Sequence, residues 1–179
     1  MHVNPRATEA DLIARTRAGA ADALGELYTR HASSVMALAY RLTGSRADAE
    51  DVLHDVFLGL PEALRRYDER GQLGAWIRRV AARAALSRLR TRARKREVPL
   101  DSVDEPRHPG DADAHAARAT LEQAIAALPD SLRIVFVLRE IDGHTHAEIG
   151  TLLGITPGAS EVRLCRAIRQ LRTLLRDSD

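Results

Sequence analysis

The stretch "HTHAEIGTLLGITPGASEVRLCRAIRQL", residues 144–171, decides the fold of the C-terminal part of the chain. It opens on His144 and His146, and two histidines one residue apart suggest either a metal site or the start of a helix. Thr145 and Glu148 have the spacing of a capping box, in which the threonine oxygen accepts from the backbone N–H three residues on and the glutamate reaches back. No acid or cysteine stands at a recognisable ligand spacing nearby. The pattern therefore favours a helix start over a metal site.

The residues after this start predict a turn between two helices. Gly154 suits a left-handed helix cap, Thr156 suits the N-cap of a second helix, and Pro157 suits its first position. Small Gly150 allows the second helix to cross closely over the first. This order and spacing are typical of a helix-turn-helix, which places its second helix in the major groove of DNA.

The second helix has two distinct sides when its residues are placed about 100° apart. One side is apolar and is predicted to face the core: Leu164, Ile168, Leu171 and Leu175. The other side is the candidate DNA-binding face: Ala159, Arg163, Arg166 and Gln170. An ordinary helix with a solvated basic face remains the alternative.

Apolar residues recur at spacings of three and four along most of the chain. This pattern predicts further helices over 8–17, 21–43, from Ser45 to about Leu60, from after Gly71 to about Lys95, 119–128 and 131–141. Gly59 and Pro61 predict a kink or break, because Pro61 has no N–H to donate to the carbonyl of Phe57. The chain has no β alternation and no internal repeat, so the predicted fold class is all-α.

A change of composition divides the chain. Residues 97–118, "EVPLDSVDEPRHPGDADAHAAR", contain three prolines, six acids and two basic residues and show no apolar period, which indicates a flexible acidic linker. The predicted organisation is two small helical domains, residues 1–96 and 119–179, joined by this linker. Apolar residues make up 45% of the chain, which is enough to build a core for each domain.

A strongly basic helix ends the first predicted domain. From Ile77 to Arg96 there are nine basic residues and no acid, which suggests phosphate contacts. Leu73, Ile77, Val80 and Ala84 are predicted to face the core. The flank beside Trp76 carries Arg79, Arg83 and Arg90, and an aromatic ring beside an arginine stripe is suited to holding an unstacked base. The alternative is that Trp76 is an ordinary core residue.

An acidic cluster lies at the start of the helix after Ser45. Its members are Asp48, Glu50, Asp51 and Asp55. Acids in a first helical turn complement the helix dipole, and Asp48 also completes capping-box spacing with Ser45. Four acids exceed what capping requires, so the alternative is a surface for a protein partner with basic residues.

Composition excludes several classes of protein. Cys165 is the only cysteine, so an internal disulfide and a cysteine zinc cluster are both excluded. Aromatic residues make up only 3% of the chain, which argues against a large stacking surface for single-stranded RNA. No window approaches the roughly 18 apolar residues of a membrane helix and the N-terminus lacks a signal-peptide pattern, so a cytoplasmic location is expected.

Taken in order, three of these segments resemble the extracytoplasmic-function group of bacterial sigma factors, the promoter-recognition subunits of RNA polymerase. "DAEDVLHDVFL" resembles the region that grips the polymerase clamp, and "GQLGAWIRRVAARAALSRLR" resembles the region that opens and reads the −10 element. "LPDSLRIVFVLREIDGHTHAEIGTLLGITPGASEVRLCRA" resembles the domain that reads the −35 element. The resemblance covers nearly the whole chain, and the three segments together are far more specific than any one alone.

This resemblance implies a non-enzymatic initiation factor that needs no cofactor or metal of its own. Its partners would be core RNA polymerase, promoter DNA and an anti-sigma factor. By position, Asp48, Asp51 and Asp55 would contact polymerase, the −10 residues would be Trp76, Arg79, Arg83 and Arg90, and the −35 residues would be Ala159, Arg163, Arg166 and Gln170. The main rival is a stand-alone helix-turn-helix regulator, and a metal-dependent hydrolase using the seven histidines is a third class.

The chain departs from the family pattern at four positions. Arg83 and Ser87 stand where the family commonly has Asn and often has Asp, which affects −10 base preference. In the recognition helix Glu161 replaces a common lysine, and Ser160 stands where an apolar residue normally packs. Glu161 is predicted to lie toward the core side of the helix and to weaken phosphate attraction rather than to change base readout.

Overall fold

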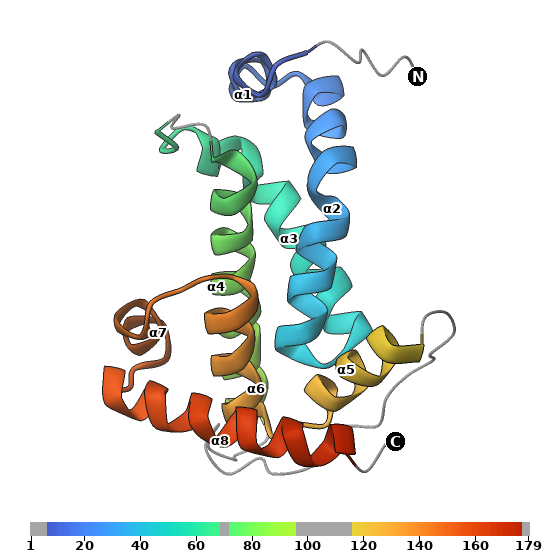
Figure 1. Ribbon diagram of the computed structural model, residues 1–179. Helices are drawn as coiled ribbons and strands as arrows, with labels where there is room; N and C mark the ends of the chain where they lie inside the picture. Colours follow the sequence, from blue (N-terminus) through green and yellow to red (C-terminus); the bar gives the residue numbers. More distant parts are fainter. Residues whose placement is uncertain (1–6, 69–71, 96–115, 177–179) are drawn as a thin grey trace. The chain divides into compact units, whose positions relative to one another are not determined.

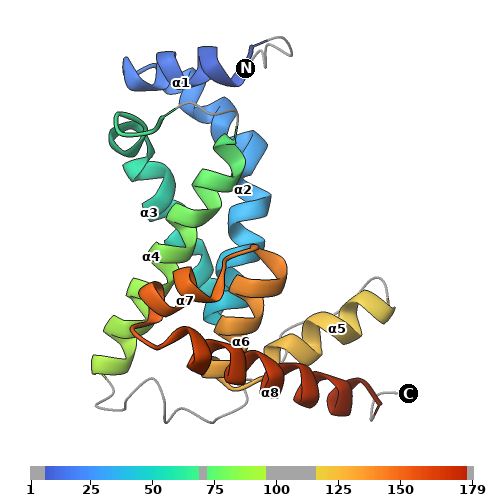
Figure 2. The same ribbon diagram turned by 60° about the vertical axis from the view of Figure 1, so that its left-hand side comes forward.

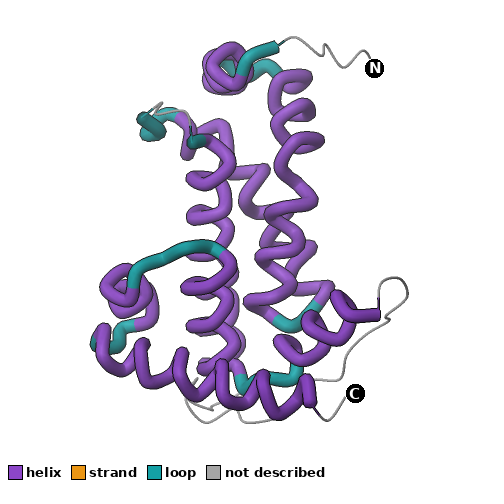
Figure 3. Tube along the Cα trace, in the orientation of Figure 1, coloured by secondary structure: helices purple, strands orange, loops and turns teal. Residues whose placement is uncertain are grey.

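The described part of the chain is entirely helical. A computed structural model describes residues 7–68, 72–95 and 116–176 of the 179. The elements are α1 (Glu9–Arg17), α2 (Ala21–Thr43), α3 (Arg46–Leu64), α4 (Leu73–Lys95), α5 (Ala116–Ala126), α6 (Asp130–Phe136), a π-helical segment η2 (Val137–Ile141), α7 (His146–Leu153) and α8 (Pro157–Arg176) (Figure 1). Figure 3 shows helices and loops and no strand in these ranges, which confirms the all-α prediction. The predicted linker lies outside the described residues over 97–115.

Short polar side chains cap the N-termini of α1 and α3. Thr8 Oγ1 accepts from the Asp11 N–H at 3.2 Å before α1. Ser45 Oγ accepts from the Asp48 N–H at 3.3 Å before α3, as the spacing of these two residues predicts. Each bond satisfies one of the N–H groups that a helix start leaves without a partner in the helix.

Pro61 does not end α3, so of the predicted kink or break at Gly59 and Pro61, the break is wrong. The helix runs through to Leu64 with Pro61 inside it. Pro61 lies in the last turn, where only a few helical hydrogen bonds remain to be lost. Phe57, Leu60 and Leu64 are buried on both sides of the proline, and this burial holds the turn in place.

The chain folds into two compact units. Unit 1 comprises the described residues within Met1–Tyr40 and Ser45–Ala85, and unit 2 comprises those within Arg41–Gly44 and Leu86–Asp179. In unit 1, α2, α3 and α4 lie side by side and α1 lies across the end of this bundle (Figures 1 and 2). Its core is made of fully buried aliphatic side chains, among them Leu12, Leu27, Val35, Val52, Leu60, Leu64, Leu73 and Ile77.

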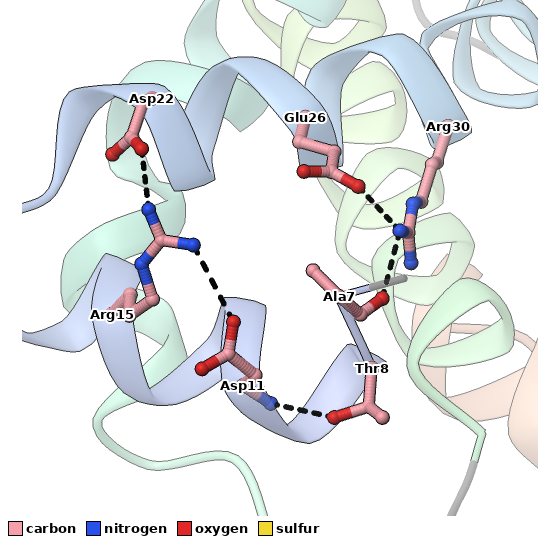
Figure 4. A network of polar contacts seen from close by, with 7 residues as sticks. All are labelled: Ala7, Thr8, Asp11, Arg15, Asp22, Glu26 and Arg30. Atoms are coloured by element: carbon pink, nitrogen blue, oxygen red, sulfur yellow. Dashed lines mark hydrogen bonds and ion pairs between the residues drawn. The ribbon is translucent and has the colours of Figure 1, made fainter. Parts of the chain in front are cut away.

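Arginine side chains attach α1 to its neighbours. Arg15 pairs with Asp11 at 3.4 Å and with Asp22 of α2, and Arg30 of α2 donates to the carbonyl of Ala7 at 2.9 Å (Figure 4). These groups are largely exposed, and exposed ion pairs each contribute at most about 1 kcal/mol.

A more buried attachment runs from α1 to the end of α3. Arg17 Nε donates to the Leu64 carbonyl at 2.9 Å and Arg17 Nη2 donates to the Tyr67 carbonyl at 2.6 Å. The carbonyls at the end of a helix have no partner within the helix itself. Arg17 therefore fixes the turn that carries Tyr67.

The core side of α4 differs from the predicted one. Leu73 and Ile77 are buried as expected, but Val80 and Ala84 are only half-buried. The buried stripe continues instead through Ala81, Ala82, Ala85, Leu86 and Leu89.

The His31 ring packs near the start of α4, where a Cβ on Gly74 would meet it at 3.4 Å. Burial lowers the pKa of His31 below its ordinary 6.5, so a neutral ring packs there.

Unit 2 is built around the segment that precedes the helix-turn-helix. The predicted helix over 131–141 is observed as α6 followed by η2, in which the Asp142 N–H bonds to the Val137 carbonyl five residues back at 3.0 Å. Ile134, Val135 and Leu138 are at most 1% exposed, so this segment lies at the centre of unit 2.

No helix in the described ranges is long and apolar enough to cross a membrane.

Candidate polymerase and nucleic-acid surfaces

The capping box at the start of α7 is present as predicted. Thr145 Oγ1 accepts from the Glu148 N–H at 3.2 Å, and Glu148 Oε2 accepts from the Thr145 N–H at 2.8 Å. His144 lies just outside the helix and His146 is its first residue. The interpretation of this motif as a helix start is therefore confirmed.

Each of the two histidines has its own local contact. His144 is buried, and its Nδ1 lies 3.2 Å from Asp142 Oδ2. His146 Nδ1 is hydrogen-bonded to Ser160 Oγ of α8 at 2.9 Å. Across the described residues, no group of three or more His, Cys, Asp or Glu side chains is placed to hold a metal ion.

Removing the cap tests how much the motif stabilises the fold. Thr145→Ala is expected to lower the free energy of unfolding by about 0.5–2 kcal/mol, measured by urea denaturation of the full chain. Thr173→Ala is the control and should have a smaller effect, because the exposed Thr173 hydroxyl bonds only to the Arg169 carbonyl of its own helix.

His144→Ala with His146→Ala is expected to leave the metal content of the purified chain unchanged. Loss of stoichiometric zinc in that double variant would restore the metal-site alternative.

The turn between α7 and α8 has the predicted chemistry. Gly154 adopts a left-handed φ of 71°, and Thr156 Oγ1 accepts from the Ala159 N–H at 3.1 Å as the N-cap of α8. Gly150 does permit a close approach, but the approaching atom belongs to the turn. A Cβ at Gly150 would lie 2.8 Å from the Ile155 carbonyl oxygen and 3.6 Å from the Pro157 nitrogen.

Gly150→Ala is expected to destabilise the helix-turn-helix, because the added Cβ would overlap the turn backbone at a cost of about 1–3 kcal/mol. The higher helix propensity of alanine would offset about 1 kcal/mol of this cost. The matched control is Gly59→Ala in α3, where a Cβ would meet nothing within 4 Å. That change should stabilise the chain by about 0.5–1 kcal/mol. Thermal unfolding of both variants measures the difference, and equal shifts of the same sign would contradict the close approach.

The recognition helix α8 is turned slightly from its predicted orientation. Its buried residues are Ser160, Ala167 and Leu171, whereas the predicted core residues Leu164, Ile168 and Leu175 are half-buried. Arg166 on the predicted DNA face is exposed, and Ala159, Arg163 and Gln170 on the same face are half-buried. Glu161 is exposed, so its predicted position toward the core is wrong.

Val162 is a further exposed residue of α8 that was not among the predicted DNA-binding residues. Its side chain is 51% exposed beside the predicted DNA face. An apolar side chain at this place is suited to contact the methyl group of thymine.

The basic flank of α4 adjoins a cavity. The cavity has a volume of about 270 Å³ and is lined by Tyr67, Asp68, Gln72, Ala75, Trp76 and Arg79. The Trp76 ring is half-buried and tilted against Tyr67, with ring centroids 4.8 Å apart. Trp76 is therefore partly a packing residue, as the alternative interpretation held, and also part of a cavity wall.

The other predicted residues of this flank differ in position. Arg79 and Arg83 are exposed in unit 1, and Arg90 is exposed in the part of α4 that belongs to unit 2. The structure thus groups Arg79 and Arg83 with Trp76. Tyr67, Asp68 and Gln72 were missed, because they lie around the turn before α4 and carry no periodic signal.

The acidic side of α3 combines charge with exposed apolar surface. Asp51 and Asp55 are exposed, Asp48 is half-buried in the first turn, and Glu50 pairs with Arg46 at 2.9 Å. Leu58, one turn after Asp55, is 67% exposed. Large apolar side chains exposed next to charged ones are typical of protein-binding surfaces.

A shallow groove of about 300 Å³ lies beside this surface, lined by Ala21, Leu24, Gly25, Tyr28, His54, Phe57 and Leu58. Tyr28 is 45% exposed and its ring meets the edge of Phe57 at a centroid distance of 4.9 Å. Tyr28 and Leu58 were missed from sequence. The spacing of Tyr28 matches the apolar period of its helix, and Leu58 lies outside the apolar period of its own helix.

Two family models match the chain: Sigma-70 region 2 over residues 27–95, and Sigma-70, region 4 over residues 118–171. RNA polymerase sigma factor CarQ of Myxococcus xanthus is 34% identical over 90% of this chain and 94% of CarQ. ECF RNA polymerase sigma factor SigE of Mycolicibacterium smegmatis is 33% identical over 84% of this chain but only 60% of SigE. A solved complex of the sigma factor RpoE with the anti-sigma factor NepR from Bartonella quintana has the same fold, with a TM-score of 0.57 and 21% identity over 85% of this chain and 96% of RpoE.

Proposed function

The chain belongs to the extracytoplasmic-function group of RNA polymerase sigma factors, and from this premise we propose how its surfaces divide the work of initiation. Residues 1–96 bind core polymerase and capture the −10 element, residues 97–118 link the two domains, and residues 119–179 bind the −35 element. The factor is not an enzyme, because the polymerase supplies the chemistry of RNA synthesis. Its place of action is the cytoplasm, where the polymerase works.

We propose that the acidic side of α3 is the polymerase-binding surface. The observation that supports it is the alignment of exposed Asp51 and Asp55 with exposed Leu58 along one side of the helix. Carboxylates would steer the encounter with a basic surface, and burial of the leucine would contribute apolar contact energy. Asp48, half-buried in the first turn, would lie at the edge of this surface.

The −35 element is assigned to one face of α8, which carries Ala159, Arg163, Arg166 and Gln170. Exposed Arg166 and half-buried Arg163 lie one turn apart on α8, the second helix of the helix-turn-helix. Arginine forms bidentate bonds with guanine in the major groove, or ion pairs with phosphate.

The −10 element is assigned to Trp76, Arg79, Arg83 and the more distant Arg90. The single observation that supports strand capture is the cavity of about 270 Å³ with an aromatic wall of Tyr67 and Trp76 and a cationic rim at Arg79. Stacking on an aromatic ring suits an unpaired base, and arginine suits the phosphate next to it. The Tyr67 hydroxyl is buried and has no hydrogen-bond partner within the described residues.

Trp76→Ala is expected to slow strand opening and to weaken capture of the unpaired strand by about 1–3 kcal/mol, the usual contribution of one stacked base. A fluorescent adenine analogue placed in the −10 element of the promoter measures opening by the polymerase complex. Trp76→Tyr keeps an aromatic wall and should retain most of the activity. Normal opening by the alanine variant, with its fold verified by circular dichroism, would remove Trp76 from the −10 site.

We also propose that an anti-sigma factor holds this chain inactive. The structure of RpoE of Bartonella quintana was solved in complex with such a partner, and this chain shares the fold of RpoE. The apolar groove between α2 and α3 offers a surface for a partner helix beside the polymerase-binding residues.

A further inference from the structure

The half of α8 that carries the DNA-binding arginines is anchored by a polar side chain. Among the buried residues of α8, Ala167 and Leu171 lie beyond Arg166, and only Ser160 lies before Arg163. Ser160 is completely buried, with 0% exposure. A hydroxyl thus occupies the deepest contact at the N-terminal end of the recognition helix.

This hydroxyl has a specific partner on the other helix. Ser160 Oγ is bonded to His146 Nδ1 at 2.9 Å, across fourteen positions of sequence. His146 is the first residue of α7, and the capping box fixes the backbone there. The hydrogen bond therefore joins the N-terminal turns of the two helices directly.

The two helices also meet through apolar and backbone contacts. The eight-residue helix α7 buries Ile149 and Gly150, and Gly150 lies against the turn and against Pro157, the first residue of α8. A buried hydroxyl destabilises the fold when it loses its hydrogen-bond partner. An apolar contact, in contrast, keeps much of its energy when one helix shifts along the other. The pair consequently favours one register of α8 against α7.

We propose that His146 and Ser160 act as a polar lock, a hydrogen-bonded pair that sets the position of α8 against α7 and so aims Arg163 and Arg166 at −35 DNA. The inference rests on the proposed assignment of these arginines. His146 and Ser160 are positioning residues that act through the arginines.

The test uses the complex of the full chain with core polymerase and a duplex carrying the −35 region upstream of its own gene. Ser160→Ala and His146→Phe are each expected to weaken binding about 2- to 12-fold, the factor that corresponds to one hydrogen bond. His146→Asn keeps a polar atom near the position of Nδ1 and should bind more tightly than His146→Phe. Thr151→Val is the control, because that exposed hydroxyl bonds to the Ala147 carbonyl within α7.

Combined variants separate positioning from simple stability. His146→Phe with Ser160→Ala removes both polar partners, so the cost of an unpaired buried group disappears but the fixed register is still lost. Binding should therefore stay weak, whereas recovery to the wild-type affinity would mean that the pair contributes stability alone. In a background of Arg163→Ala and Arg166→Ala, the further change Ser160→Ala should have little effect, because the arginines it positions are absent.

The outcomes distinguish this inference from the assignment beneath it. If the arginine variant binds as wild type does, the −35 assignment fails and the polar lock fails with it. If the arginine variant is weak but Ser160→Ala binds normally, or if the Ser160 and arginine effects simply multiply, the polar lock alone is overturned.

Discussion

Reversing two charges on α3, by Asp51→Arg with Asp55→Arg, is expected to abolish binding of the chain to core polymerase. Both side chains are exposed on the proposed polymerase-binding surface. Placing like charges against each other at an interface costs several kcal/mol, which is more than about a hundredfold in Kd. Co-purification of core polymerase with the tagged full chain measures the effect.

The adjacent acid provides the control for this change. Glu50 is also exposed, but it lies on another side of α3 and pairs with Arg46. Glu50→Arg should leave polymerase binding intact, and both variants should keep their unfolding free energy to within about 0.5 kcal/mol because the changes are at the surface. Polymerase recovered in normal amounts with the Asp51 and Asp55 variant would remove α3 from the interface.

The second large effect separates the two DNA surfaces. Arg163→Ala with Arg166→Ala should weaken closed-duplex binding by the polymerase complex. Each lost phosphate contact lowers the salt slope by roughly 0.9, and each lost bidentate base contact costs about 1–3 kcal/mol and relaxes one −35 position. A template already mismatched across −10 should not restore this loss.

Arg79→Ala with Arg83→Ala should behave in the opposite way. Arg79 lines the same cavity as Trp76, and Arg83 is exposed about one turn further along α4, so both should act once the strands part. Duplex binding should stay nearly intact, strand opening should slow, and the mismatched template should restore much of the activity. Rescue of the Arg163 and Arg166 variant together with failure to rescue the Arg79 and Arg83 variant would show that the two helices are assigned the wrong way round.

Features that depend on neighbours in sequence could be predicted. The caps at Ser45, Thr145 and Thr156 each involve a side chain and a backbone N–H three residues apart, so their spacing alone specifies them. The same locality made the turn at Gly154 predictable. Pro61 was misjudged because its effect depends on how close it stands to the end of the helix, which the pattern did not give.

Features that depend on packing between helices could not be predicted. The helical wheel placed Leu164 and Ile168 at the centre of the α8 contact, but the backbone turns Ser160 and Ala167 inward and leaves Glu161 exposed. Tyr67 packs against Trp76 from the end of α3, where Arg17 bonds to the Tyr67 carbonyl across 50 positions of sequence. Periodicity gives the apolar side of a helix, and it does not give which apolar residues stay at the rim, as Leu58 and Tyr28 do.

Run-off transcription shows directly whether the chain starts RNA synthesis with core polymerase. Core polymerase and the full chain are combined on a linear template carrying the DNA upstream of its own gene. We expect a transcript of defined length that requires the chain and disappears with Asp51→Arg and Asp55→Arg. No such transcript, together with tight binding of the chain to the same duplex without polymerase, would contradict this expectation and favour a stand-alone helix-turn-helix regulator.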